Sequence, residues 1–179
     1  MNQAERAKKY EEINNLAAEL LHISQNTLLV KLRFLDMAVS QLKLKPWDND
    51  GVAVDGEYIY YNPLWVLKRY KSEQTVLTRD YLHMVFHCIF HHAFVGTLVD
   101  RDKWNLACDI AVEAAIMELN ITQLAAARCI KERPILQKLQ QELNLLTAEK
   151  NYAHFLDNNF SEQKINDWQE IFKADEHDI

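Results

Sequence analysis

Residues that interrupt secondary structure are scarce in this chain, which has three glycines and three prolines among 179 residues. Since turns and loops depend on these two residue types, long helices should dominate the fold. Apolar side chains make up 49% of the chain, which at this length suits one buried core better than two. We therefore predict a single, mostly helical domain over residues 1–179.

One segment departs from the helical pattern. Val52 and Val54 lie two residues apart before Asp55-Gly56, and Tyr58 and Tyr60 lie two residues apart after it. Such alternation on both sides of an Asp-Gly turn predicts a β-hairpin. The predicted fold class is therefore mainly α with a small β-hairpin or sheet, which is an α+β fold.

The remaining segments have apolar residues at the spacings of amphipathic helices. Asn62-Pro63, Thr147 and Ser161 have side chains that begin helices, and Gly96 can end one. The acidic residues 174–179 are expected to fray. The predicted helices cover about residues 3–44 with a break allowed near 24–27, 64–70, 75–94, 100–119, a helix starting at 134, 148–156 and 161–172.

Composition argues against several classes of protein. The net charge is −6, and basic residues are interspersed with acidic ones, so we expect no nucleic-acid partner. The N-terminus is polar and no apolar run reaches membrane-spanning length, so we expect neither a signal peptide nor a membrane span. Cys88, Cys108 and Cys129 are an odd number of cysteines and suit reduced thiols. A cytoplasmic protein is the expectation.

The residues most informative about function are four histidines within ten positions, His83, His87, His91 and His92. Helical residues four apart differ by about 40° in direction and by roughly 6 Å along the axis, so His83 and His87 can bind one ion. His91 extends the same stripe, whereas His92 reaches the ion only if the helix ends or bends before it. A lone histidine is usually a polar core or surface residue, but four so close together favour a metal site.

A catalytic zinc site has three protein ligands and one open position, so another segment must supply the third ligand. Asp109 is an acid with apolar neighbours on both sides, where an unpaired carboxylate would be costly and a cation would compensate. A salt bridge or a helix cap is the alternative explanation for this residue. Glu113 lies one turn further on the same face, as an alternative ligand or as a partner that holds a histidine N–H.

These residues resemble the metallopeptidase domains of zincin type that often precede a von Willebrand factor A-like domain, and the resemblance covers most of the chain. The helix of that family has a His-Glu-x-x-His motif with a further histidine five residues on. The resemblance implies a zinc site with His83, His87 and Asp109 as ligands, and a hairpin edge strand along which an extended peptide binds. The matching segments are Tyr60-Tyr61-Asn62-Pro63, His83 with His87 and His92, Trp104-Asn105-Leu106-Ala107-Cys108-Asp109, and 147–152.

The chain departs from that family after the first histidine, where Met84 replaces the glutamate. In zincins the metal lowers the pKa of bound water toward ~7 and the glutamate takes its proton, which methionine cannot do. Losing a general base typically costs ~10² to 10⁴ in rate. We therefore expect an impaired peptidase or a pseudoenzyme that retains its metal, with Glu113 as the candidate substitute base. We expect the protein to act alone or with a separate partner chain.

Two other functions fit the same residues. The first is a helical module that binds a peptide or protein through the aromatic residues of the hairpin, among them Tyr58 and Tyr60, with a structural metal or none. The second is a redox metal enzyme, since two histidines and a carboxylate also describe non-haem iron sites. Such ligands usually come from a β-barrel, which makes the iron enzyme the weaker alternative.

Overall fold

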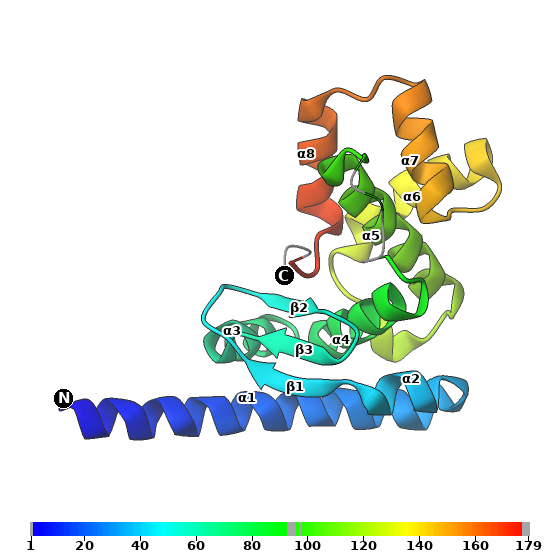
Figure 1. Ribbon diagram of the computed structural model, residues 1–179. Coiled ribbons are helices and arrows are strands. Elements are labelled where there is room, and N and C mark those ends of the chain that lie inside the picture. Colours follow the sequence, from blue (N-terminus) through cyan, green and yellow to red (C-terminus); the bar gives the residue numbers. More distant parts are fainter. Residues whose placement is uncertain (1, 93–95, 97, 177–179) are drawn as a thin grey trace.

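The computed structural model describes residues 2–92, 96 and 98–176, which form two helical halves, one of them containing a small sheet (Figure 1). The lower half in that view contains α1 (Gln3–Lys31), η1 (Arg33–Leu35), α2 (Asp36–Gln41), β1 (Lys43–Pro46), β2 (Val52–Val54), β3 (Tyr58–Tyr61), α3 (Pro63–Ser72) and α4 (Gln74–Ile89). The upper half contains α5 (Arg101–Glu118), α6 (Cys129–Leu143), α7 (Ala148–Asp157) and α8 (Glu162–Phe172), with η2 (Thr122–Leu124) before α6. Each half has its own hydrophobic cluster, and α5 contributes to both clusters. The predicted class, mainly α with a small sheet, is confirmed.

Helix α1 continues through the segment where a break was allowed. Ser24 is buried and its hydroxyl lies 3.3 Å from that of Thr78 on α4. Gln25 donates a hydrogen bond of 3.0 Å to the backbone carbonyl of Val39. These polar residues therefore have partners in other elements, and such partners are not visible in the local pattern. The helix ends at Lys31, and the predicted helical end near residue 44 is wrong because residues 43–46 form β1.

The sheet has the strand order β1-β3-β2, so β3 is central and β2 is an edge strand. The predicted hairpin is confirmed, because β2 and β3 pair antiparallel. Its turn depends on Gly56, which has φ +97°, a conformation that favours glycine. The Asp55 carboxylate accepts backbone N–H bonds from Glu57 and Tyr58 at 2.8 and 2.7 Å. Strand β1 pairs with β3 in parallel, and this strand was not predicted from the sequence.

Helix α4 ends earlier than predicted. It stops at Ile89, while the predicted end near Phe94 lies outside the described residues. His91 has φ +57°, a left-handed conformation typical of helix ends, and the N–H of His92 bonds to the carbonyl of His87 at 3.1 Å. Because the helix ends before His92, that side chain folds back toward the helix instead of projecting from its far face.

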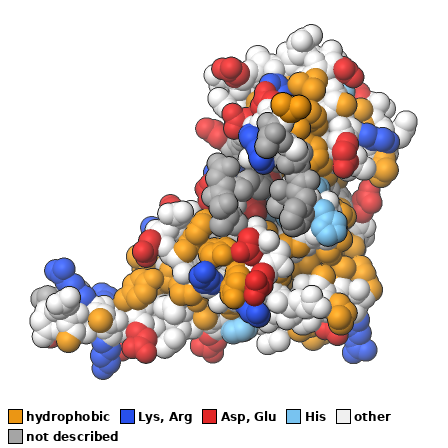
Figure 2. Space-filling model, viewed as in Figure 1, with side chains coloured by type: hydrophobic (Ala, Val, Ile, Leu, Met, Phe, Trp, Pro, Cys, Tyr) orange, Lys and Arg blue, Asp and Glu red, His pale blue; other side chains and the backbone are white. Residues whose placement is uncertain are grey.

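The upper half follows most of the predicted helix starts. Asp100, Thr147 and Ser161 cap α5, α7 and α8 by accepting backbone N–H bonds. Helix α6 begins at Cys129, so Pro134 lies inside the helix and not at its start, which corrects the prediction. Within the described residues, no helix is both long and apolar enough to cross a membrane. Acidic and basic side chains are interspersed on the face shown in Figure 2.

The chain after α8 does not fray as far as the structure describes it. From Phe172 it descends toward the sheet (Figure 1), and Ala174 and Asp175 are buried. The N–H of Glu176 donates a hydrogen bond of 2.7 Å to the carbonyl of Val52 on β2. The prediction of fraying is therefore wrong for residues 174–176, because they pack against the rest of the molecule, and residues 177–179 lie outside the described residues.

Candidate metal centre

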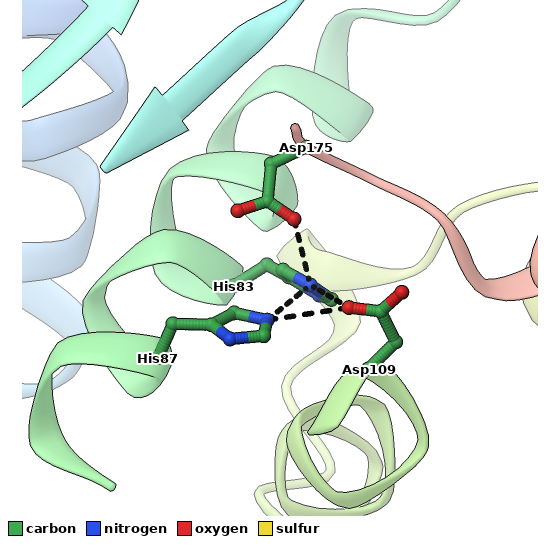
Figure 3. Close-up of side chains that lie close together, drawn as sticks. All are labelled: His83, His87, Asp109 and Asp175. Carbon is green, nitrogen blue, oxygen red and sulfur yellow. Dashed lines mark hydrogen bonds and ion pairs between the residues drawn. The ribbon is translucent and has the colours of Figure 1, made fainter. Parts of the chain in front are cut away.

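The histidine helix α4 and the following helix α5 bring three of the predicted site residues together (Figure 3). The Nε2 atoms of His83 and His87 lie 2.9 Å apart. The Oδ1 atom of Asp109 lies 3.4 Å from the first and 3.3 Å from the second. The side chains of His83 and His87, four residues apart on α4, and of Asp109 on α5 therefore meet between the two helices.

A fourth residue of this cluster, Asp175, was not predicted. Its Oδ1 atom lies 3.5 Å from Nε2 of His83, and the ligand atoms of all four residues lie within 4.8 Å of one another. All four side chains are buried. The local sequence shows little sign of this role, since Asp175 stands in an acidic terminal segment. The apolar residues Phe172 and Ala174 before it are a weak indication that the segment packs.

The chemistry and spacing of these groups fit a divalent metal ion. Two imidazole nitrogens and carboxylate oxygens are ordinary zinc ligands at about 2.0–2.2 Å, which places neighbouring ligand atoms of a tetrahedral site roughly 3.3 Å apart. The three nitrogen–oxygen distances of 3.3–3.5 Å match that separation. Two Nε2 lone pairs at 2.9 Å repel each other unless a proton or a cation lies between them. The residues present therefore fit a metal.

The other nitrogen of each histidine is also held in place. Nδ1 of His83 lies 2.7 Å from Oε1 of Glu113, and Nδ1 of His87 lies 3.2 Å from Nδ1 of His92. A carboxylate on Nδ1 keeps the proton on that atom and leaves the Nε2 lone pair of His83 for a metal. His92 itself is positioned by Trp104, whose indole N–H donates to the His92 carbonyl at 3.2 Å.

Glu113 is the inner end of a buried ionic network that extends away from the cluster. Arg79 donates through Nε at 2.9 Å to Oε2 of Glu113, and Arg128 donates at 2.7 Å to Oε1. Arg128 also pairs with Asp80 at 2.6 Å and with Glu132 at 3.0 Å. The guanidinium groups of this network face an equal number of carboxylates; its members are Arg69, Arg79, Arg128, Asp80, Glu113 and Glu132.

The charges around these groups shift their pKa values. Burial raises the pKa of Glu113, but the charges of Arg128, His83 and Arg79 outweigh it, so the pKa lies well below its usual range. Burial and the charge of Glu113 raise the pKa of Glu132 to about 7. Burial lowers the pKa of His83, but hydrogen bonds with Asp109, Asp175 and Glu113 raise it well above its usual value. Glu113 is thus an anion beside the site.

The remaining predicted site residues lie elsewhere. His91 is exposed at the turn after α4, and Met84 is buried in the hydrophobic cluster of the lower half. Tyr58 and Tyr60 lie on the central strand β3, where Lys45 stands over both rings at 5.2 and 5.1 Å. The hydroxyl of Tyr60 donates to Asp55 at 2.8 Å. These contacts are within the sheet and its turns.

A cavity of about 370 Å³ lies beside the cluster, with His92 in its wall. Most of its lining is apolar, with Glu118 and Glu149 as its acidic residues. Because His92 also contacts His87, its side chain connects the cavity wall to the cluster. The lining residues are Phe90, His92, Ala111, Ala114, Ala115, Glu118, Leu145, Leu146, Thr147, Ala148 and Glu149.

Comparison with known proteins gives one result for this arrangement. A family model described as a putative metallopeptidase domain matches residues 28–175, a range that includes all four residues of the cluster. No curated protein and no solved structure matches the chain.

Proposed function

Since the chain belongs to the family described as a putative metallopeptidase domain, we propose that it binds zinc through His83, His87 and Asp109 and is hydrolytically impaired. The observation that supports this most is the convergence of two Nε2 atoms and a carboxylate on one buried point. Zinc bound there would act as a Lewis acid and would lower the pKa of a bound water. The histidines and Asp109 would hold the ion in place.

Glu113 serves this site as a positioning residue and not as a base. Its Oε1 atom contacts Nδ1 of His83, the nitrogen on the other side of the ring from Nε2. Both of its oxygens accept hydrogen bonds from Arg79 or Arg128. A carboxylate with a strongly lowered pKa and these partners is a weak proton acceptor. Of the two roles that the sequence allowed for Glu113, its position favours the holding of a histidine N–H.

The absence of a catalytic base supports the proposal that the chain is hydrolytically impaired. The position after the first histidine is Met84, whose side chain is 1% exposed and packs in the hydrophobic cluster with Leu82 and Val85. A thioether at this position neither accepts nor relays a proton. The chain therefore keeps the groups that bind and orient a metal and lacks the group that would activate water at it.

Thermal unfolding with and without zinc tests the metal site. Zinc at about 100 times its Kd should stabilise the chain by about 2.7 kcal/mol, or roughly 5–10 °C in Tm at this size. The increase should disappear in His83→Ala, which removes one ligand. The matched control is His22→Ala, since His22 is exposed on α1 and should leave the zinc-induced shift unchanged. Equal zinc shifts in both variants would assign the effect to other sites and contradict the proposal.

A further inference from the structure

The segment after α8 crosses from one half of the molecule to the other. We call Lys173–Glu176 the C-terminal strap. It follows Phe172, which is fully buried in the hydrophobic cluster of the upper half, and it ends beside β2 in the lower half. Figure 1 shows it running down from α8 to the sheet. The strap therefore spans the junction between the halves at the level of the metal centre.

The strap ends against the edge strand of the sheet. Glu176 forms a parallel bridge with Ala53, and its N–H donates to the carbonyl of Val52 at 2.7 Å. An extended peptide that adds to a sheet edge makes this kind of backbone contact. The edge of β2 is thus contacted by this same chain at Glu176.

The side chain before that bridge reaches the metal centre. Asp175 is 4% exposed, and its Oδ1 atom lies 3.5 Å from Nε2 of His83 (Figure 3). The same carboxylate belongs to the group of four possible ligands whose atoms lie within 4.8 Å of one another. The backbone contact at Glu176 and the carboxylate at Asp175 are separate observations, and they place the strap over one site.

We propose that the strap is a built-in occupant of the peptide-binding edge and that Asp175 is a fourth, displaceable metal ligand that closes the centre. This inference rests on the proposed metal site. Catalytic zinc sites keep one position open, whereas four protein ligands make a closed site. With Asp175 in place the centre has no position for water or a peptide carbonyl, so the strap blocks it independently of the absent base.

The attachment of the strap is compatible with release. The backbone contacts between the strap and β2 within the described residues are confined to Glu176, which forms the bridge with Ala53 and donates to the carbonyl of Val52. The ion pair between Lys173 and Glu176 is on the surface, where such pairs contribute little. Phe172 is buried and anchors the start of the segment. A competing ligand with a carboxylate or a hydroxamate group has to replace the Asp175 carboxylate in the cluster and the backbone contacts of Glu176.

Metal and inhibitor binding by the full chain test this proposal. Asp175→Asn removes the charge with little change in shape, and Glu176→Gln is the control, because it removes a neighbouring charge and keeps the backbone N–H. Zinc affinity is measured by competition with a chromogenic chelator, and acetohydroxamic acid is titrated against the cobalt-loaded protein by visible absorption. In Asp175→Asn we expect zinc to bind at least about tenfold more weakly and acetohydroxamate about tenfold more tightly.

Each outcome separates the strap from the metal site. Glu176→Gln should match the unchanged chain in both titrations. If Asp175→Asn and Asp175→Ala both match the unchanged chain, with zinc bound normally, the strap proposal is wrong and the metal site stands. If the unchanged chain binds no zinc or cobalt, both proposals are wrong. Asp175→Ala is included because asparagine can still coordinate a metal, whereas alanine cannot.

Discussion

Replacing Glu113 with alanine is expected to destabilise the metal-free chain by about 3–5 kcal/mol, since breaking a buried ion pair leaves uncompensated charge. Glu113 is fully buried and is the shared partner of Arg79, Arg128 and His83. Without it, Arg79 keeps the carbonyl of Leu124 and a longer contact to Glu132 at 3.6 Å. Losing the partner of His83 should also weaken zinc binding by about 10- to 100-fold.

Urea unfolding of the metal-free protein measures the first effect, and chelator competition measures the second. Glu118→Ala is the matched control, because Glu118 is an exposed acid on the same helix and its loss should stay within ~0.5 kcal/mol. If the alanine variant does not fold, Glu113→Gln, which keeps the shape and part of the hydrogen bonding, gives an intermediate value. A cost below about 1 kcal/mol for Glu113→Ala would mean that the network does not depend on this residue.

Replacing Met84 with glutamate is expected to cost stability and to restore no hydrolysis. Met84 lies in the hydrophobic cluster of the lower half, so a carboxyl there should have its pKa raised by roughly 2–3 units. A raised pKa in the folded state means that stability falls as pH rises from the unfolded pKa to the folded one. The cost should therefore be small near pH 4 and reach about 3–4 kcal/mol at pH 8.

Met84→Gln provides the control for this variant, because glutamine has a similar length and does not titrate. Its cost should be the same at both pH values, so the difference between the two variants isolates the charge. Peptide hydrolysis is measured with zinc over a peptide library, in Met84→Glu alone and combined with Asp175→Ala. Hydrolysis by Met84→Glu alone, with no pH-dependent cost, would show that residue 84 faces the metal and that Asp175 does not close the site.

The candidate site was partly accessible from the sequence because some of its features are local. His83 and His87 are one helical turn apart, and the apolar residues around Asp109 mark a buried acid. Asp175 has only a weak local signal, since its burial arises from a strap that crosses between the halves. The contact of His92 with His87 depends on α4 ending at Ile89. The local sequence predicted a later end, near Phe94, so this contact was not predicted.

In the fold, too, the elements that depend on local sequence were predicted, and those that depend on tertiary contacts were not. The hairpin and the capped helix starts at Asn62, Thr147 and Ser161 depend on short-range hydrogen bonds and were predicted. Strand β1 forms because it pairs with β3, fifteen residues later in the register. The alternation of Lys43, Leu44 and Lys45 is too short to distinguish a strand from the end of the preceding helical pattern. The start of α6 before Pro134 was likewise not visible from residue preference.

Metal content of the unmodified chain tests the central claim most directly. Protein purified without an affinity tag is stripped with a chelator, titrated with zinc and analysed for bound metal after removal of free ions. The four-residue cluster of His83, His87, Asp109 and Asp175 predicts about one tightly bound equivalent of zinc. Less than about a tenth of an equivalent, with no uptake during the titration, would contradict the existence of the metal centre.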